Sequence, residues 1–125
     1  VIVSILDEKE LNEIIKTCHQ LSITPLVEIF NESELSLAIN NGAELIGINN
    51  RNLNNLETSL SVFKDLAPKV PKNKILISES GIKNIDHVKL MAEQGADGVL
   101  VGESILKSND INAHIKKLAS IKKCK

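Results

Sequence analysis

The chain has 125 residues, of which 42% are hydrophobic and 25% are charged, a length and composition typical of one globular domain. Fifteen Lys and Arg residues against 16 Asp and Glu residues give a net charge of −1, which excludes a general attraction to nucleic acid or to an anionic membrane. Two phenylalanines are the only aromatic residues, too few to form a stacking surface for single-stranded nucleic acid.

Five short apolar runs rich in Ile, Val and Leu predict β-strands. Their apolar character is nearly continuous, which favours parallel strands buried on both faces over half-exposed antiparallel strands. Each run is followed by a segment with apolar residues at helical spacing. In chain order, the predicted strands are Val1–Leu6, Pro25–Phe30, Glu44–Asn49, Lys74–Glu79 and Asp97–Gly102.

The predicted helices have recognisable beginnings. Asp7 followed by Glu10 resembles a capping box, in which two side chains satisfy free backbone N–H groups at a helix start. Asn31 followed by Glu34 repeats the pattern. The five helices are expected to begin at Asp7, Asn31, Leu56, Asn84 or Ile85, and Asp110, and the third to run to Ala67.

The order of a strand followed by a helix occurs five times without a linker. Residues 41–47 and 94–102 share one pattern, a helix end followed by Gly-Ala, an acidic residue, an apolar strand and a glycine, which indicates a repeated unit. The Gly-x-Gly-x-x-Gly turn of dinucleotide-binding folds is absent, and glycines instead end the late strands, as in barrel phosphate sites. The sequence therefore predicts an α/β fold over residues 1–125: a single domain and a partial (βα)8 TIM barrel of five parallel βα units.

The positions of the cysteines and histidines and the lengths of the apolar runs exclude further classes of protein. Cys18 and Cys124 lie far apart, with no histidine at a ligand spacing, so we expect reduced thiols in the cytoplasm and no metal site. His19, His87 and His114 fall in predicted helices and are expected on the surface. No apolar run approaches the ~20 residues of a transmembrane helix. Because Val1 already opens an apolar run, we expect the chain to be part of a longer polypeptide.

Polar residues follow three of the predicted strands, which predicts one shared site. Glu28 lies inside its strand, either facing outward on an edge or facing inward as a general base or acid with a raised pKa. Asn49 ends the next strand and Arg51 follows it, either as a turn or as groups that fix a substrate hydroxyl and a ligand carboxylate.

The ends of the last two strands predict an anion site. Glu79-Ser80-Gly81 and Gly102-Glu103 follow consecutive strands, and glycine allows backbone N–H groups to approach an anion closely. A short helical turn over residues 103–107 would point its N-terminus at the same anion. Ordinary turns are the alternative interpretation of these glycines.

Four segments together resemble the indole-3-glycerol phosphate synthases: Pro-Leu-Val-Glu-Ile at 25–29, Gly-Ile-Asn-Asn-Arg-Asn-Leu at 47–53, Ser-Glu-Ser-Gly-Ile at 78–82 and Val-Leu-Val-Gly-Glu-Ser at 99–104. The resemblance runs the whole length and implies strands four to eight of a (βα)8 barrel. It also implies a lyase of tryptophan biosynthesis. Such an enzyme closes the indole ring of 1-(2-carboxyphenylamino)-1-deoxyribulose 5-phosphate with loss of CO₂ and water, and it needs no metal or organic cofactor.

The resemblance also implies a role for each candidate residue. These are Glu28 as a base or proton shuttle in dehydration, Asn49 and Glu79 around substrate hydroxyls and a catalytic lysine, Arg51 near the anthranilate carboxylate, Ser80 on the pocket wall, and the backbones of Gly81, Gly102 and Glu103 around the phosphate.

The departures from the family are large. The family's first three strands carry a glutamate and two lysines, including the general acid, that are not in these 125 residues, so we expect the chain alone not to catalyse ring closure. Two alternatives stay open: another phosphate-binding barrel, such as a phosphoribosyl isomerase, and a non-catalytic phosphate-binding half-barrel. The expected partners are a phosphorylated small molecule and, through open barrel edges, a second copy of the chain, with neither nucleic acid nor a membrane.

Overall fold

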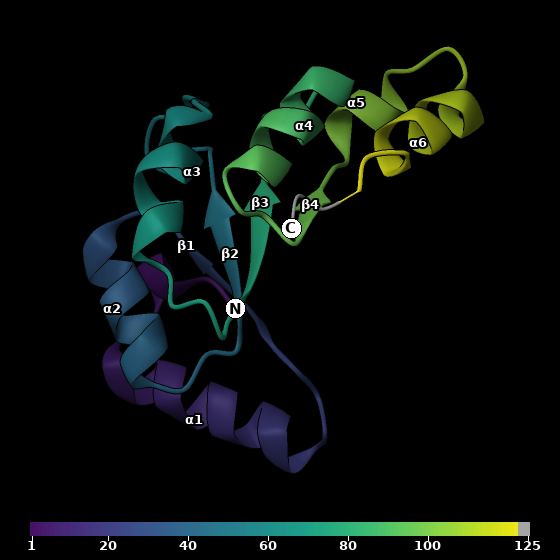
Figure 1. Cartoon of the computed structure of the whole chain (residues 1–125). Helices are drawn as coiled ribbons and strands as arrows, with labels where there is room; N and C mark the ends of the chain where they lie inside the picture. Colours follow the sequence, from purple (N-terminus) through teal and green to yellow (C-terminus); the bar gives the residue numbers. More distant parts are fainter. Residues whose placement is uncertain (123–125) are drawn as a thin grey trace.

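A parallel four-stranded sheet forms the centre of the chain in a computed structural model that describes residues 1–122 (Figure 1). The strands lie in sequence order, and each pairs in parallel with the next. This order and the helices between the strands confirm the predicted partial (βα)8 barrel. The strands are β1 (Leu26–Ile29), β2 (Leu45–Asn49), β3 (Ile75–Glu79) and β4 (Gly98–Leu100).

The expected strand Val1–Leu6 is the exception, so the sheet has four strands in place of five. Ile2 forms a single parallel bridge with Glu28, and the chain then turns into a 3-10 helix, η1 (Val3–Ile5). A strand in this position has a partner on one side only, because no described strand lies beyond it. One ladder of hydrogen bonds does not hold six residues extended here.

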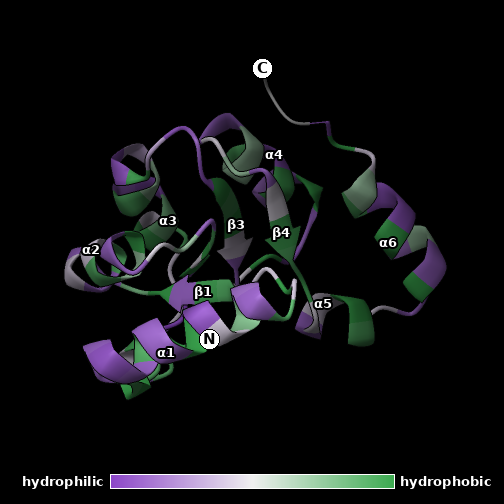
Figure 2. Cartoon of the chain, turned by 90° about the horizontal axis from the view of Figure 1, so that it is seen from below, coloured by the Kyte–Doolittle hydropathy of each residue, from purple (hydrophilic) through white to green (hydrophobic). Residues whose placement is uncertain are grey.

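The helices mostly begin where their caps predict. The Asp7 side chain accepts from the backbone of Glu10, whose side chain accepts from Asp7 in return, a complete capping box. Figure 2 shows α2, α3 and α4 along one side of the sheet. The helices are α1 (Glu8–Gln20), α2 (Glu32–Asn40), α3 (Ser61–Leu66) with a 3-10 extension η2 (Ala67–Lys69), α4 (Ile85–Glu93), α5 (Glu103–Leu106) and α6 (Ile111–Ala119).

The third helix begins five residues later than expected. The chain after β2 hydrogen-bonds to itself, with Asn52 N–H donating to Glu57 O at 2.8 Å and an isolated antiparallel bridge between Arg51 and Thr58. Leu56 has a φ of +62°, in the left-handed region that a helix excludes. The apolar residues at helical spacing there therefore lie in a loop and not in a helix. This loop contains Arg51.

The two faces of the sheet differ strongly in exposure, contrary to the expected burial on both. Val27 and Ile46 are fully buried under the helices on the outer face. On the inner face, which corresponds to a barrel lumen, Ile75 is 51% and Leu100 is 53% exposed. Alternate residues of a strand point to opposite faces, so the inner face also receives Glu28, Asn49 and Glu79.

Lys123, Cys124 and Lys125 lie outside the described residues, and so does the thiol expected at Cys124. Within residues 1–122, Cys18 is a free thiol, and none of the helices has the length and apolar content needed to cross a membrane.

Candidate active site

A carboxylate and an amide meet at the ends of β1 and β2. Glu28 Oε1 accepts a hydrogen bond of 2.6 Å from Asn49 Nδ2, so Glu28 faces inward and not outward from an edge strand. Asn49 Oδ1 in turn accepts from the backbone N–H of Arg51 at 2.9 Å. Both ends of the Asn49 amide group are therefore held by hydrogen bonds. The amide in turn holds the Glu28 carboxylate at the inner face of the sheet.

Glu79 brings a second carboxylate to the same face. Its side chain is buried, and Oε1 has no hydrogen-bond partner among the described residues. Burial, and then the charge of Glu28, raise the pKa of Glu79 to about 7, so this carboxyl group exchanges a proton near neutral pH. A carboxyl group with such a pKa has the properties of a general acid or base.

Gly47 makes room for the Glu79 carboxyl group. A Cβ at this position would lie 1.7 Å from Glu79 Oε1, so any side chain on Gly47 would displace the carboxyl. In the sequence, Gly47 was expected only as the glycine that ends the repeated pattern of residues 41–47. A glycine inside an apolar strand is itself a signal of close approach by another group.

Asn50 is a structural residue of the site. Its side chain is fully buried, and Nδ2 donates to Ser78 Oγ, Glu79 O and Ser80 O at 3.0 to 3.2 Å. Its Oδ1 accepts from the backbone N–H of Phe63 at 3.1 Å. Asn50 thus fastens the end of β2 to the end of β3 and to α3.

The glycines for which an anion site was predicted line a cavity of about 550 Å³. Glu28, Asn49 and Glu79 do not line this cavity, and the Asn49 contact with the backbone of Arg51 connects the two parts of the site. The cavity brings together the predicted residues Arg51, Ser80, Gly81, Gly102 and Glu103, and adds Ile82, Lys83, Leu100, Val101, Ser104 and Lys107.

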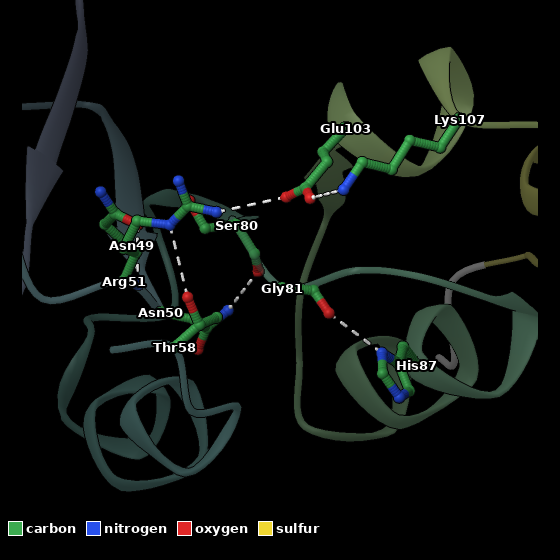
Figure 3. Close-up of polar contacts among 9 residues, drawn as sticks. All are labelled: Asn49, Asn50, Arg51, Thr58, Ser80, Gly81, His87, Glu103 and Lys107. Carbon is green, nitrogen blue, oxygen red and sulfur yellow. Dashed lines mark hydrogen bonds and ion pairs between the residues drawn. The ribbon is translucent and has the colours of Figure 1, made fainter. Parts of the chain in front are cut away.

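Arg51 lines this cavity and contacts Glu103, another lining residue. Its Nη2 lies 3.4 Å from Glu103 Oε2, and its Nε donates to Thr58 Oγ1 at 3.3 Å (Figure 3). Lys107 Nζ lies 2.6 Å from Glu103 Oε1. Lys107, and then Arg51, lower the pKa of the Glu103 carboxyl group, so it carries a negative charge at neutral pH.

The loop after β3 has an unusual backbone. Ser80 and Gly81 have φ values of +62° and +76°, so two consecutive residues adopt left-handed geometry. The Gly81 carbonyl lies 3.1 Å from His87 Nδ1, which makes His87 a half-buried partner of the loop and not a solvated residue as expected. Among the described residues, the backbone N–H groups of Gly81, Gly102 and Glu103 have no acceptor.

Lys83 and Lys107 are the charged residues among the cavity residues that were not predicted from the sequence. Lys83 comes two residues after Gly81, directly behind the predicted strand end, so its position in the sequence was an available signal. Lys107 lies one helical turn after Glu103, at the end of the short turn that was expected to point at the anion, and its side chain was not expected to take part. Within residues 1–122, no group of three or more His, Cys, Asp or Glu side chains is arranged to hold a metal ion.

A parallel sheet in sequence order, with helices outside and polar groups at the carboxyl ends of its strands, defines a protein of the βα-barrel class. Solved structures agree. The chain superposes on 3-hexulose-6-phosphate synthase from Salmonella typhimurium with a TM-score of 0.80 and 17% identity, covering 96% of this chain and 58% of that one. For thiamine phosphate pyrophosphorylase from Pyrococcus furiosus, the TM-score is 0.71 at 15% identity, covering 88% and 52%. At these identities the likeness shows the fold alone.

The sequence comparisons are more specific. The family described as indole-3-glycerol phosphate synthase matches residues 1–118. The indole-3-glycerol phosphate synthase of Lachnoclostridium phytofermentans is 41% identical over 120 residues, 96% of this chain and 44% of that protein. That of Methanothermobacter marburgensis is 41% identical over 117 residues, 93% and 43% respectively. The chain belongs to the indole-3-glycerol phosphate synthase family, and it spans less than half the length of these relatives.

Proposed function

We propose that this chain forms one side of the catalytic pocket of an indole-3-glycerol phosphate synthase, a carboxy-lyase of tryptophan biosynthesis. The substrate is 1-(2-carboxyphenylamino)-1-deoxyribulose 5-phosphate, and the reaction loses CO₂ and water. The observation that carries the proposal is the arrangement of Glu28, Asn49 and Glu79 beside a cavity lined by Arg51.

The carboxylate end of the site performs proton transfer in this proposal. Glu28 acts as the base or proton shuttle of dehydration, oriented by its 2.6 Å hydrogen bond from Asn49. Asn49 and Glu79 hold substrate hydroxyls and the catalytic lysine. The raised pKa of Glu79, about 7, suits a group that gains and loses a proton at neutral pH.

The cavity binds the two anionic groups of the substrate. Arg51 pairs with the anthranilate carboxylate, and Ser80 lines the wall. The backbone N–H groups of Gly81, Gly102 and Glu103 cradle the phosphate, supported by their lack of an acceptor among the described residues. No step in this proposal needs a metal or an organic cofactor.

The general-acid lysine that the resemblance implies has no counterpart in these 125 residues, so the chain by itself binds substrate without closing the ring. The open inner face and the sheet edges also support self-association. We further propose that residues 1–125 form a single domain and act in the cytoplasm, where the free Cys18 thiol would stay reduced.

One titration of the purified chain tests both binding and chemistry. Adding 1-(2-carboxyphenylamino)-1-deoxyribulose 5-phosphate is expected to shift the NMR signals of the Gly81 and Gly102 amides, without any indole fluorescence appearing. Ribulose 5-phosphate, which lacks the carboxyphenylamino group, is expected to bind at least tenfold more weakly because it offers Arg51 no ligand carboxylate.

Equal affinity for the two sugar phosphates would contradict the proposal and favour a general phosphate-binding half-barrel or an isomerase-type barrel. Indole formation by the pure chain would show that the missing lysines are dispensable.

A further inference from the structure

The charged residues of the cavity do not all suit an anionic ligand. Arg51, Lys83 and Lys107 bring three positive charges to it, whereas Glu103 brings a negative charge. Figure 3 shows the Glu103 carboxylate between Arg51 and Lys107, at 3.4 Å from the first and 2.6 Å from the second. One carboxylate therefore engages two of the three cations.

Both contacts are formed by solvent-exposed side chains. The Glu103 and Lys107 side chains are 61% and 74% exposed, and that of Arg51 is 40% exposed. Exposed ion pairs are individually weak, so an incoming anion can displace them at small cost. Arg51 is also held by Thr58 and stays at the cavity when Glu103 leaves.

We propose that Glu103 is an internal counterion. Its carboxylate pairs with Arg51 and Lys107 while the cavity is empty, and it competes for these two cations with the anionic groups of the ligand. This inference rests on the proposed phosphate site. It assigns a specificity role to the side chain of Glu103, whereas only the backbone of this residue was expected to act. A small anion must replace two ion pairs with one group and binds weakly. A ligand with both a phosphate and a carboxylate offers one group to each cation.

Sulfate is the probe for a direct test, because its charge stays at −2 across the pH range in which phosphate titrates. The 125-residue chain is titrated with sodium sulfate at constant ionic strength, so that screening does not change. The amide signals of Gly81 and Gly102 report occupancy. The Glu103→Gln variant keeps the side-chain length and is expected to bind sulfate about three- to tenfold more tightly than the unmodified chain.

Two further variants make the result specific. Glu13→Gln removes a charge from an exposed position on α1, outside the cavity, and is expected to change the sulfate affinity less than twofold. Glu103→Ala removes the same carboxylate without leaving an amide, and should reproduce the gain. Adding Arg51→Gln to Glu103→Gln should reduce the gain, because one of the two released cations is then missing.

The outcomes separate this inference from the proposed function. Shifts at Gly81 and Gly102 with equal affinity in the unmodified chain and in Glu103→Gln would overturn the counterion role and leave the phosphate site standing. An equal gain in Glu13→Gln would reduce the effect to net charge and also overturn it. Absence of shifts in every variant would overturn the phosphate site and the counterion role together.

Discussion

Glu79 shows how the surroundings of one residue change its chemistry. Its ordinary pKa of 4.5 rises to about 7 in the folded chain, through burial first and the neighbouring Glu28 second. Between these values the folded chain holds a proton that the unfolded chain has released. The proton stabilises the fold, fully below pH 4.5, and this contribution is lost as the pH rises through about 7.

Glu79→Gln removes an ionisable group whose charge is unfavourable in the fold. We expect the variant to be more stable than the unmodified chain by about 1–3 kcal/mol at pH 8 and nearly equal at pH 4.5, measured by urea unfolding. Glu93→Gln, an exposed position at the end of α4, serves as the control and should change stability by less than about 0.5 kcal/mol at both pH values. Destabilisation at pH 8 by Glu79→Gln would show that the ionised carboxylate is favourable in the fold.

At the scale of elements, the site is held together by side chains that join strand ends to one another. Asn50 fastens β2, the loop after β3 and the first turn of α3 through its two amide atoms. Without it, the buried N–H of Phe63 and the carbonyl of Ser80 lose a partner. Unsatisfied buried groups each cost about 1–3 kcal/mol.

Asn50→Ala is therefore expected to lower the free energy of unfolding by about 2–4 kcal/mol, measured in urea at pH 5. Asn54→Ala, in the exposed loop after β2, is the matched control and should cost less than about 0.5 kcal/mol. If both variants lost the same small amount, the Asn50 contacts would not be what positions these elements.

For the whole molecule, the open inner face is the dominant feature. Helices cover one side of the sheet, while Ile75 and Leu100 stay about half exposed on the other. A half-exposed apolar sheet face with unpaired edges favours association with a second copy of the chain. Leu100 lies on β4, where both the face and the edge are open.

Leu100→Lys is expected to raise the dissociation constant of self-association at least tenfold without unfolding the chain, because the side chain is already 53% exposed. Sedimentation equilibrium measures the change. Leu21→Lys, at a position 66% exposed just after α1, is the control and should leave association unaltered. A monomeric unmodified chain at high concentration would contradict the proposed self-association.

Most of the fold follows from local patterns in the sequence. The capping box of Asp7 and Glu10 and the apolar runs at β1 to β4 act over a few residues, so periodicity and spacing predict them. Motif resemblance likewise indicates the family from the sequence, and the comparisons confirm it. Residues 1–6 are the counterexample, because their conformation depends on whether another strand pairs with their outer edge.

The sequence by itself thus determined the βα units that contain β1 to β4, the family and the strand ends that carry the polar residues. Only the tertiary structure decided how those residues meet. It set the Glu79 carboxyl over Gly47, buried Asn50 at a junction of three elements, and brought Glu103 to Arg51, 52 positions away in the chain. The physical reason is that pKa shifts and ion pairs depend on distances across neighbouring strands, which are set by sheet register and burial and not by local spacing.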